Sequence, residues 1–432
     1  MVEVADAVIL AAGYGKGLEP LTYTKHKVLM PILNKTLLYH HLEILRKLNV
    51  KRVILVVSYL KDQVIKYLRS LEKEIPKRPV DVLVVDEGKP LGTAHALLKG
   101  YEYVRSKEFL VIYGDVYIEL EDIRSIFDVK GNVITTYRVS DDPRKYGVVI
   151  MDNGNVKRIV EKPKEIISRN VNAGVYKLTS DFIKYVEKVK LSERGEYELT
   201  DAINMAIEEG LIIKSLSLNY WLDVGRPWKL LELNRYLLHK VKESSIKGKV
   251  ESGAILKGTV ILSEGSEVLS GSYIVGPVFI DTNVVIGPNA YIRPYTVILS
   301  GAKIGFNVEV KESIVMEDTH ISHQAYVGDS IVGEQCNLGA GTILANLRFD
   351  EASVKVTVKG VREDSGRKKL GAIVGGFVKT GVNVSICPGV KVGSYSWIYP
   401  GVTICRDVPP CTIVKSDGSL SELRGCPVKG YD

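Results

Sequence analysis

Two hydrophobic patterns follow one another along the chain, and the change falls near residue 240. The first half alternates short β-branched runs with stretches whose apolar residues recur at helical spacing. The predicted strands occupy residues 7–12, 52–58, 80–85 and 109–113, and the predicted helices between them occupy 37–48 and 64–71. Such alternation predicts a mainly parallel sheet with helices on both faces, in which ligands bind beyond the carboxyl ends of the strands.

The second half repeats with a period of six. Apolar residues fall at every sixth position from Val268 to Val310, and a second register runs from Val374 to Ile404 with a break at Thr380. This period fits neither a helix nor a single strand, and it is typical of a hexapeptide parallel β-helix. Three hexads make one triangular coil of 18 residues, and successive coils stack about 4.8 Å apart.

The predicted fold class is α/β, with three regions. Residues 1–227 form a Rossmann-like domain, residues 228–248 contain a linking helix, and residues 249–432 form a left-handed parallel β-helix. The irregular stretch 347–370 interrupts the hexads, so we expect it to leave the coil as a loop.

Composition and charge restrict the function. The chain has 432 residues, 45% of them apolar, which suits more than one folded domain. No apolar run approaches the roughly 18–20 residues that span a bilayer, so we expect no membrane partner and a cytoplasmic location. The net charge of +7 is spread along the chain, which argues against a nucleic-acid partner and suits phosphorylated substrates.

The five cysteines all follow residue 335 and include no C-x-x-C pair, which argues against a zinc or redox site. Cys387 and Cys405 are one predicted coil apart. We therefore expect them to stack on adjacent coils, where a disulfide or two reduced thiols would fit.

The turn after the first predicted strand carries candidate chemistry. Residues 10–32 read LAAGYGKGLEPLTYTKHKVLMPI, and the Gly13-x-Gly15 turn would let backbone N–H groups and the start of a following helix approach a polyphosphate. The segment resembles the signature of the sugar-1-phosphate nucleotidyltransferases. The matching residues are Gly13, Gly15, Leu18, Pro20, Leu21, Thr22, Lys27, Leu29 and Pro31.

The resemblance implies that Lys27 contacts phosphate. Two positions depart from the family pattern: Gly17 replaces an arginine that braces the triphosphate, and His26 replaces a proline. Lys16 could supply a cation to the phosphates, although without bidentate geometry. Restoring arginine at position 17 should raise the rate if the loop is impaired, and leave it unchanged if Lys16 compensates.

A second segment concerns the base. Residues 91–96, which include Gly92 and Thr93, resemble the base-reading segment of the same family. Relatives that use UTP or dTTP often carry glutamine where this chain has Glu87, whereas the run 87–92 is similar to guanylyltransferases of the GDP-mannose type. A carboxylate only accepts hydrogen bonds, so Glu87 suits guanine, unless its side chain faces solvent and reads nothing. UTP, dTTP and GTP all stay open.

Two aspartates are the candidate metal ligands. Asp115 follows the fourth predicted strand, and Asp223 lies in a Trp-Leu-Asp-Val-Gly-Arg-Pro segment that matches the family. Two carboxylates with phosphate oxygens suit Mg²⁺, which would neutralise charge on the α-phosphate. The alternatives are a capping role for Asp115 and a salt bridge for Asp223.

The resemblance also places the sugar phosphate. It implies that Glu161 binds a sugar hydroxyl, Lys162 the phosphate and Asn172 a further hydroxyl or amide. The matching triplets also include Gly147 and Gly174. The implied reaction is in-line attack of the sugar-1-phosphate on the α-phosphorus of a nucleoside triphosphate, with release of pyrophosphate.

The β-helix region carries a second resemblance, through the segments 323–330, 337–347 and 365–371. They are similar to the acetyltransferase half of archaeal bifunctional sugar-1-phosphate nucleotidyltransferases/amino-sugar acetyltransferases, and this likeness covers essentially the whole chain. It implies acetyl transfer from acetyl-CoA to glucosamine- or galactosamine-1-phosphate. Deprotonating an ammonium group suits a histidine, and His323 is the matching base.

By the same match, Tyr326 and Asn346 orient the amino sugar and Lys355 binds its phosphate, while relatives often have a further lysine in place of Ala352. The basic run 367–369 could meet the phosphates of coenzyme A. The alternative is that His323 is an ordinary turn residue and the basic run a solvated loop.

Three functions remain. The first is a bifunctional enzyme that makes a nucleotide-activated N-acetyl sugar, with Mg²⁺ and acetyl-CoA. The second is a mannose-1-phosphate guanylyltransferase whose β-helix only assembles subunits, and the third is a regulatory homologue with an impaired nucleotidyl site. A three-sided apolar column favours a homotrimer or a dimer of trimers.

Overall fold

The computed structural model describes residues 4–74 and 80–428. The chain divides into two compact units. The first takes in the chain up to Tyr14, His26–Leu29 and Leu37–Val224, and the second comprises Gly15–Lys25, Met30–Thr36 and Gly225 onward. The segment Gly15–Lys25 belongs with the β-helix region because it packs there: Lys25 Nζ lies 3.1 Å from a Glu317 carboxylate oxygen, and Ser394 Oγ donates to Pro20 O at 3.1 Å.

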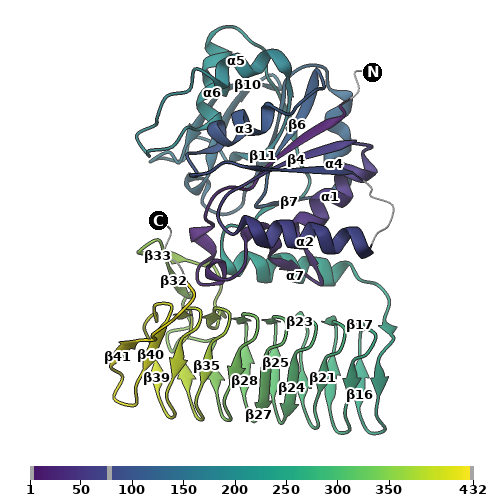
Figure 1. Cartoon of the computed structure of the whole chain (residues 1–432), viewed down its shortest axis with the longest axis vertical. Coiled ribbons are helices and arrows are strands. Elements are labelled where there is room, and N and C mark those ends of the chain that lie inside the picture. Colours follow the sequence, from purple (N-terminus) through teal and green to yellow (C-terminus); the bar gives the residue numbers. More distant parts are fainter. Residues whose placement is uncertain (1–3, 75–79, 429–432) are drawn as a thin grey trace. The chain divides into compact units, whose positions relative to one another are not determined.

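A nine-stranded sheet forms the first unit (Figure 1). Its strands, in spatial order, are β5 (Asp81–Asp86), β4 (Arg52–Val57), β1 (Asp6–Leu10), β6 (Glu108–Tyr113), β11 (Asn170–Thr179), β8 (Val133–Arg138), β12 (Lys214–Ser217), β10 (Asn155–Glu161) and β9 (Gly147–Asp152). The four predicted strands form its parallel half.

The other half of the sheet is mixed, so the expectation of a mainly parallel sheet was wrong there. β11 runs antiparallel to both β6 and β8, and β9 pairs antiparallel with β10. For β9 and β10 the reason is local: Asn153 and Gly154 adopt positive φ angles of 48° and 77°, which closes a tight hairpin between these two strands.

Helices cover both faces of the sheet, as predicted. β1 shows why, because Ala7 and Ile9 point into one core while Val8 and Leu10 point into the other. The helices of this unit are α1 (Leu37–Lys47), α2 (Lys61–Glu74), α3 (Thr93–Tyr101), α4 (Leu120–Arg124), α5 (Ile183–Val186) and α6 (Leu199–Glu208). α1 and α2 pack into the first core, and α3, α5 and α6 pack into the second.

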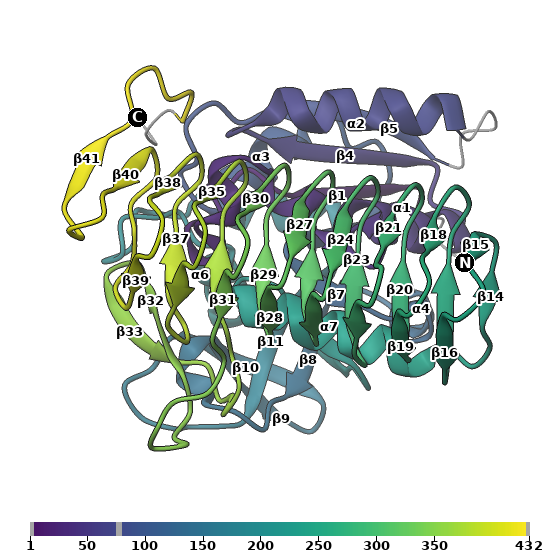
Figure 2. The ribbon, with the colours of Figure 1, turned by 90° about the horizontal axis from the view of Figure 1, so that it is seen from below.

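The second unit is built on three parallel sheets whose strands are stacked coil upon coil (Figures 1 and 2). The first sheet contains β14 (Ser245–Ile246), β17 (Val260–Leu262), β20 (Val278–Ile280), β23 (Thr296–Ile298), β26 (Ile314–Val315), β29 (Ile331–Val332), β34 (Ile373–Val374) and β37 (Lys391–Val392). The second contains β15 (Lys249–Val250), β18 (Glu267–Val268), β21 (Val285–Ile286), β24 (Lys303–Phe306), β27 (His320–His323), β30 (Asn337–Leu338), β35 (Lys379–Thr380), β38 (Trp397–Ile398), β40 (Thr412–Val414) and, paired antiparallel, β41 (Leu420–Glu422). The third contains β16 (Ile255–Lys257), β19 (Tyr273–Val275), β22 (Tyr291–Ile292), β25 (Glu309–Lys311), β28 (Tyr326–Gly328), β31 (Ile343–Leu344), β36 (Ser385–Ile386) and β39 (Thr403–Ile404). The apolar residues of the six-residue repeat line one continuous core, which is the arrangement expected of a β-helix.

The coil repeat is not constant. Ile286 pairs with Ile304, an advance of 18 residues, but Ile304 pairs with Ile321 and Ile321 with Leu338, each an advance of 17. The corner between the third and first sheets loses one residue in these two coils. The shift explains why the six-residue pattern in the sequence lapses after Val310.

The predicted loop 347–370 leaves the coil as a hairpin, β32 (Lys355–Val358) and β33 (Val361–Asp364), which Figure 2 shows beside the coils. The linking helix is α7 (Pro227–Lys240). Asn234 on α7 accepts a hydrogen bond from Leu33 N at 2.6 Å, and Arg235 contacts Glu312 at 2.9 Å, so both side chains fix α7 within this unit.

Two disulfides cross-link the C-terminal end of the β-helix region. Cys387 and Cys405 stack on adjacent coils as predicted and are bonded, and Cys411 is bonded to Cys426. Cys336 is a free, buried thiol.

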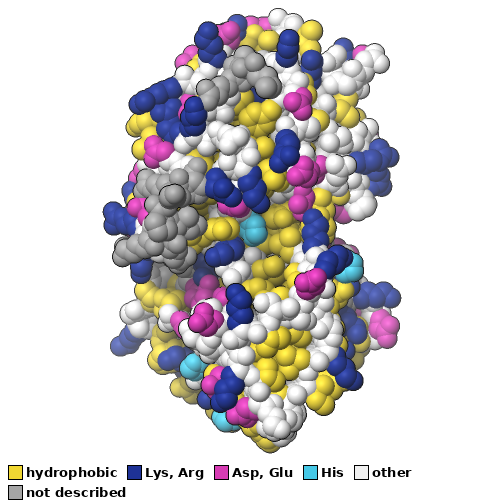
Figure 3. All heavy atoms as spheres, turned by 90° about the vertical axis from the view of Figure 1, so that its right-hand side faces the viewer, with side chains coloured by type: hydrophobic (Ala, Val, Ile, Leu, Met, Phe, Trp, Pro, Cys, Tyr) yellow, Lys and Arg dark blue, Asp and Glu magenta, His cyan; other side chains and the backbone are white. Residues whose placement is uncertain are grey.

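Within the described residues, no helix is long and apolar enough to cross a membrane. On the face shown in Figure 3, Lys and Arg side chains are scattered among Asp and Glu side chains. This agrees with the spread of charge along the sequence.

Candidate functional site

The signature turn folds as a tight loop followed by short 3₁₀ turns. Gly15 adopts a left-handed conformation with φ 71°, and its carbonyl accepts a hydrogen bond from Thr22 Oγ1 at 3.1 Å. The segments that follow are η1 (Lys16–Leu18) and η2 (Leu21–Tyr23). The expected helix start is therefore absent after this loop, and anion binding there depends on the loop's N–H groups and on side-chain cations.

Lys27 is a nearly buried lysine of the first unit's candidate site. Its Nζ is 3.0 Å from Oδ2 of Asp115, and it is also the nearest group to Gly13, where an added Cβ would lie 3.6 Å from it. The glycine thus leaves a passage to a nearly buried cation. Lys27 and Asp115, which the sequence proposed for phosphate and for metal, are in direct contact.

The two candidate metal ligands are brought together by a short ladder. β7 (Val116–Ile118) pairs antiparallel with β13 (Trp221–Asp223), which sets Asp223 opposite Val116. Val224 N also donates to the carbonyl of Asp115 at 2.8 Å. Among the described residues, no group of three or more His, Cys, Asp or Glu side chains is arranged around a point. The backbones of Asp115 and Asp223 are thus close, and two carboxylates suit an Mg²⁺ ion that takes its remaining ligands from substrate oxygens and water.

The segment around Gly92 is held against Tyr197. Gly92 has φ 127°, and a Cβ there would overlap the Tyr197 carbonyl oxygen, so a side chain is excluded. Thr93 Oγ1 accepts a hydrogen bond from Leu199 N at 2.9 Å. The loop proposed for base recognition is therefore rigid.

Glu87 is buried, not solvent-facing. Its Oε1 lies 2.7 Å from Nδ1 of His95 and accepts a hydrogen bond from Leu91 N at 3.2 Å. Oε1 of Glu87 thus holds the 87–95 segment together through these two contacts. A contact between Glu87 and a base stays a prediction, and it would have to use the other oxygen.

Glu161 is the strongest candidate on the sugar side. Its Oε2 is buried without a hydrogen-bond partner among the described residues, and a Cβ at Gly147 would overlap this atom. Burial raises the pKa of Glu161, and the Glu198 charge adds to the effect, although Arg194 and Lys162 oppose it. An unsatisfied acceptor packed against Gly147 fits a hydroxyl donor from a ligand.

Asn172 and Gly174 belong to a hydrogen-bonded row beside Glu161. Asn172 Nδ2 donates to Tyr176 Oη at 2.6 Å, Tyr176 Oη donates to Tyr113 Oη at 3.0 Å, and Asn172 Oδ1 accepts from Gly174 N at 3.1 Å. At Gly174, with φ 72°, a Cβ would lie 2.7 Å from the Tyr113 ring. The row fixes the amide, which keeps one N–H for a ligand.

Sequence reasoning missed Arg194 on this side. Its Nη1 lies 3.6 Å from Glu161 and 3.3 Å from Glu198, so a guanidinium faces the same carboxylate as the proposed Lys162. Lys162 itself directly follows Glu161 and has a positive φ of 44°. Two cations next to Glu161, the carboxylate that the sequence suggested for a sugar hydroxyl, suit a sugar phosphate.

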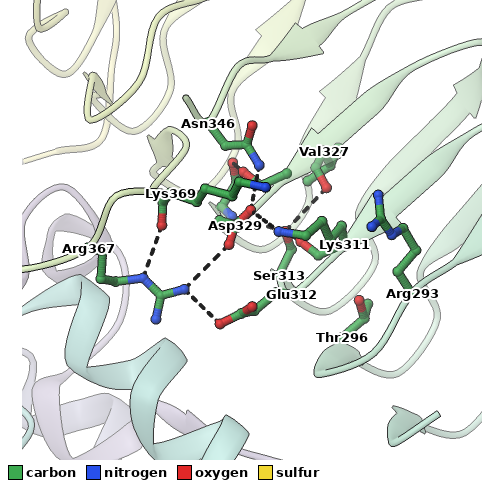
Figure 4. Close-up of polar contacts among 12 residues, drawn as sticks. Arg293, Thr296, Lys311, Glu312, Ser313, Val327, Asp329, Asn346, Arg367 and Lys369 are labelled. Carbon is green, nitrogen blue, oxygen red and sulfur yellow. Dashed lines mark hydrogen bonds and ion pairs between the residues drawn. The ribbon is translucent and has the colours of Figure 1, made fainter. Parts of the chain in front are cut away.

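A second constellation lies in the β-helix, at the shortened corner (Figure 4). The buried Asp329 carboxylate contacts Lys311 Nζ at 2.7 Å and Arg367 Nη2 at 3.4 Å, and it accepts a hydrogen bond from Asn346 Nδ2. Glu312 occupies the equivalent position one coil earlier and contacts Arg367 at 2.7 Å. With Arg235, which also contacts Glu312, two carboxylates and three cations meet at this corner.

The charges in this corner stabilise one another. Burial opposes ionisation of Glu312, but the hydrogen bonds and charges of Arg367 and Arg235 outweigh it and lower the pKa of this carboxyl. Arg367, which the sequence assigned to coenzyme A phosphates, is here engaged with the corner. Its proposed contact with coenzyme A stays untested.

Tyr326 and Asn346, which the resemblance assigns to the amino sugar, lie next to each other around Gly328. A Cβ at Gly328 would lie 2.5 Å from Tyr326 Oη and 2.6 Å from Asn346 Nδ2, so the glycine makes room for both. Burial raises the pKa of Tyr326, and the nearby Asp329 and Glu309 charges add to this rise. The hydrogen bond from Asn346 favours the ionised form and opposes the rise in pKa. His323 ends β27 three residues before Tyr326, and its side chain is exposed.

Lys355 begins β32 in the hairpin, with an exposed side chain. Lys311, which sequence reasoning missed, is a lysine that does contact the buried corner, through Asp329. Arg293 was also missed, and it pairs with Glu309 on the next coil at 2.8 Å. The sequence did carry a signal for Lys311. The six-residue repeat loses one residue after Val310, and the charged residues Lys311 and Glu312 stand at that place.

Comparison with known proteins identifies the class. The family model for nucleotidyl transferases matches residues 6–240, and the model for the GMPPB C-terminal domain matches residues 274–365. A crystal structure of apo UDP-glucose pyrophosphorylase aligns over 55% of this chain and all of its own, with a TM-score of 0.50 and 20% identity, which concerns the fold alone. The first half of the chain is thus a nucleotidyl transferase domain.

Relatives that match nearly end to end are more specific. The bifunctional sugar-1-phosphate nucleotidylyltransferase/acetyltransferase of Sulfurisphaera tokodaii is 45% identical, over 93% of this chain and 98% of its own. The bifunctional protein GlmU of Methanocaldococcus jannaschii is 44% identical, over 95% and 97%, and that of Listeria monocytogenes is 28% identical, over 93% of both. The chain belongs to this family of bifunctional transferases.

Proposed function

We propose that the chain transfers a nucleotidyl group from a nucleoside triphosphate to a sugar-1-phosphate, and an acetyl group from acetyl-CoA to an amino-sugar-1-phosphate. The proposal has its main support in one observation at each site. In the first unit it is the unpartnered Glu161 oxygen behind Gly147. In the β-helix it is the pairing of Tyr326 and Asn346 around Gly328, next to the buried charged corner.

In nucleotidyl transfer the sugar phosphate would be held by Glu161, Lys162 and Asn172. A phosphate oxygen attacks the α-phosphorus, a new P–O bond forms, and pyrophosphate leaves as its P–O bond breaks. Lys27, whose Nζ lies 3.0 Å from Asp115 Oδ2, would balance charge on the phosphates. Asp115 and Asp223 would hold Mg²⁺, which when bound supplies charge neutralisation at the α-phosphate.

In acetyl transfer His323 would take a proton from the amino group of the sugar. The freed amine attacks the thioester carbonyl, a C–N bond forms, the C–S bond breaks and the coenzyme A thiol leaves. Tyr326 and Asn346 would orient the sugar, and Lys311 and Arg293 are the cations we add to Lys355 for its phosphate. The acceptor class is glucosamine- or galactosamine-1-phosphate.

We further propose that the β-helix is left-handed and that the chain forms a homotrimer or a dimer of trimers. Exposed apolar side chains support an assembly: Tyr291 and Ile343 lie on the third sheet, and Phe306 ends a strand of the second. His323 is exposed in the single chain, so a neighbouring copy would shield it.

A panel of UTP, dTTP and GTP against sugar-1-phosphates, followed by pyrophosphate release, tests the first activity. Acetyl-CoA turnover with both amino-sugar phosphates tests the second. Pyrophosphate release with GTP and mannose-1-phosphate but no acetyl transfer would instead favour a guanylyltransferase, which the match to the GMPPB C-terminal domain makes the second candidate. Ligand binding without turnover in any assay would favour the regulatory homologue.

A further inference from the structure

Position 17 has no room for any side chain. A Cβ built on Gly17 would overlap the Gly225 carbonyl oxygen and lie 2.5 Å from Nη1 of Arg226. A backbone carbonyl cannot swing aside as a flexible side chain can. The glycine is therefore required by the packing of the signature loop against residues 225–226, and an arginine at position 17 would have to displace this backbone.

The group that faces Gly17 is itself a guanidinium. Arg226 precedes α7 and follows the segment that carries Asp223. Its Nη1 donates to Gly225 O at 2.9 Å and is the atom nearest to Gly17 among the side chains. The chain thus lacks an arginine in the loop, but it brings one to the loop from another segment of the same unit.

Arg226 is held in a fixed orientation. Its Nε and Nη2 donate to the two carboxylate oxygens of Glu363 at 2.8 and 2.9 Å. Glu363 lies on β33, opposite Val356 of β32, so the hairpin positions the pair. The Arg226 and Glu363 side chains are 30% and 24% exposed, which leaves the guanidinium within reach of a ligand.

A cation at this place has a chemical use. The loop that contains Gly15 and Lys16 presents backbone N–H groups to an anion, and a nucleoside triphosphate carries several negative charges. Lys16 is a point charge, whereas a planar guanidinium can donate two parallel hydrogen bonds to phosphate oxygens. Arg226 places a guanidinium beside the loop, with Nε and Nη2 donating to Glu363.

We propose that Arg226 binds the triphosphate of the nucleotide at the signature loop, in the role that no side chain at position 17 can fill, and that Glu363 is the positioning residue that holds it there. The inference rests on the proposed nucleotidyl transfer.

The test is kinetic, with full-length protein. Arg226→Ala should lower kcat/KM for the nucleoside triphosphate in pyrophosphate release by about 100-fold, as for loss of one donor to a reacting oxyanion. Arg226→Lys should recover only part of the loss. Glu363→Gln should raise KM more than it lowers kcat, and should add nothing to Arg226→Ala in the double variant. Free guanidinium ion at millimolar concentration should partly restore Arg226→Ala.

Arg362→Ala is the matched control, because Arg362 is an exposed cation next to Glu363 on the same hairpin, and its Nη1 donates to Thr357 Oγ1 at 3.4 Å. It should leave the nucleotidyl reaction unchanged. Acetyl transfer should stay near wild type in every variant, which reports an intact fold.

The inference would be overturned if Arg226→Ala kept the wild-type kcat/KM. It would also be overturned if Glu363→Gln had its full effect on KM in protein that already carries Arg226→Ala. Wild-type protein that releases no pyrophosphate from any triphosphate would instead overturn the proposed nucleotidyl transfer. The two failures are thus distinguishable.

Discussion

Nζ of Lys311 lies 2.7 Å from Oδ2 of Asp329, whose side chain is almost fully buried at the shortened corner of the β-helix. The same carboxylate contacts Arg367, and Asn346 donates to it. A buried ion pair of this kind contributes little relative to apolar packing, but removing one partner leaves a charge uncompensated. Asp329 therefore determines where Lys311, Arg367 and Asn346 lie.

Asp329→Asn should destabilise the β-helix by about 3–5 kcal/mol, because two cations lose their buried partner. Acetyl transfer should fall while nucleotidyl transfer persists below the melting temperature. Urea unfolding measures the first effect and the two activity assays the second. Asp350→Asn is the control, since Asp350 pairs with Arg348 at the surface and its loss should cost at most about 1 kcal/mol.

His323→Ala should lower acetyl transfer by about 10²–10⁴-fold, the range for a general base, and leave pyrophosphate release unchanged. His320→Ala, on the same strand β27 and equally exposed, should leave both activities near wild type. Acetyl-CoA turnover at saturating amino-sugar phosphate decides the matter. Equal effects of the two substitutions would exclude His323 as the base.

Glu161→Gln should weaken nucleotidyl transfer and stabilise the fold. Burial and the Glu198 charge raise the pKa of Glu161 above its ordinary value of 4.5, so the folded protein binds this proton more tightly than the unfolded chain. Ionised Glu161 therefore costs stability above the folded pKa, and the neutral amide removes that cost.

Thermal unfolding at pH 7 should give a higher Tm for Glu161→Gln, while KM for the sugar-1-phosphate rises. In wild type, kcat/KM should fall on the acid side with an apparent pKa above 4.5, and the variant should lack this limb. Glu165→Gln, at an exposed position nearby, should change neither quantity. A lower Tm for Glu161→Gln would contradict the raised pKa.

His26 should make the fold sensitive to acid. Burial, and then the Lys27 charge, lower the pKa of His26 from 6.5 to about 3, and its Nδ1 accepts a hydrogen bond from Val28 N at 3.2 Å. The unfolded chain binds the proton first, so stability is complete above pH 6.5 and declines as pH falls toward 3. At pH 4.5 the loss should reach about 2–3 kcal/mol from this group.

His26→Asn keeps an acceptor for Val28 N and does not titrate, so the free energy of unfolding should fall less between pH 7 and pH 4.5 than in wild type. Urea midpoints at several pH values measure this difference. His239→Asn, in the last turn of α7, serves as the comparison. Parallel pH profiles for wild type and His26→Asn would count against a buried neutral His26.

The Cys387–Cys405 disulfide should stabilise the end of the β-helix. It closes a loop of 18 residues, which corresponds to about 3 kcal/mol in the chain-entropy treatment. Cys387→Ser with Cys405→Ser should therefore lower Tm by several degrees under oxidising conditions and abolish most of the effect of added reductant. Thiol counting should find Cys336 alone after unfolding without reductant, and a higher count would show that the bridges are open.

The sequence alone determined the alternating strands and helices, the six-residue repeat and most of the candidate residues. These features depend on residues near one another in the chain: a buried parallel strand is a continuous apolar run, and each coil needs one inward residue per hexad. Asp115, Glu161 and His323 could be named because each lies in a recognisable local segment.

Tertiary structure decided the pairings between distant segments. Hydrophobic pattern carries no register between residues far apart, so the antiparallel half of the sheet and the 17-residue coils were not predictable from it. The same limit applies to position 17: the sequence shows a missing arginine, and only the packing of Gly17 against Arg226 and its partner Glu363 shows a guanidinium in that space. Side chains that approach from separate elements have no common signature in one dimension.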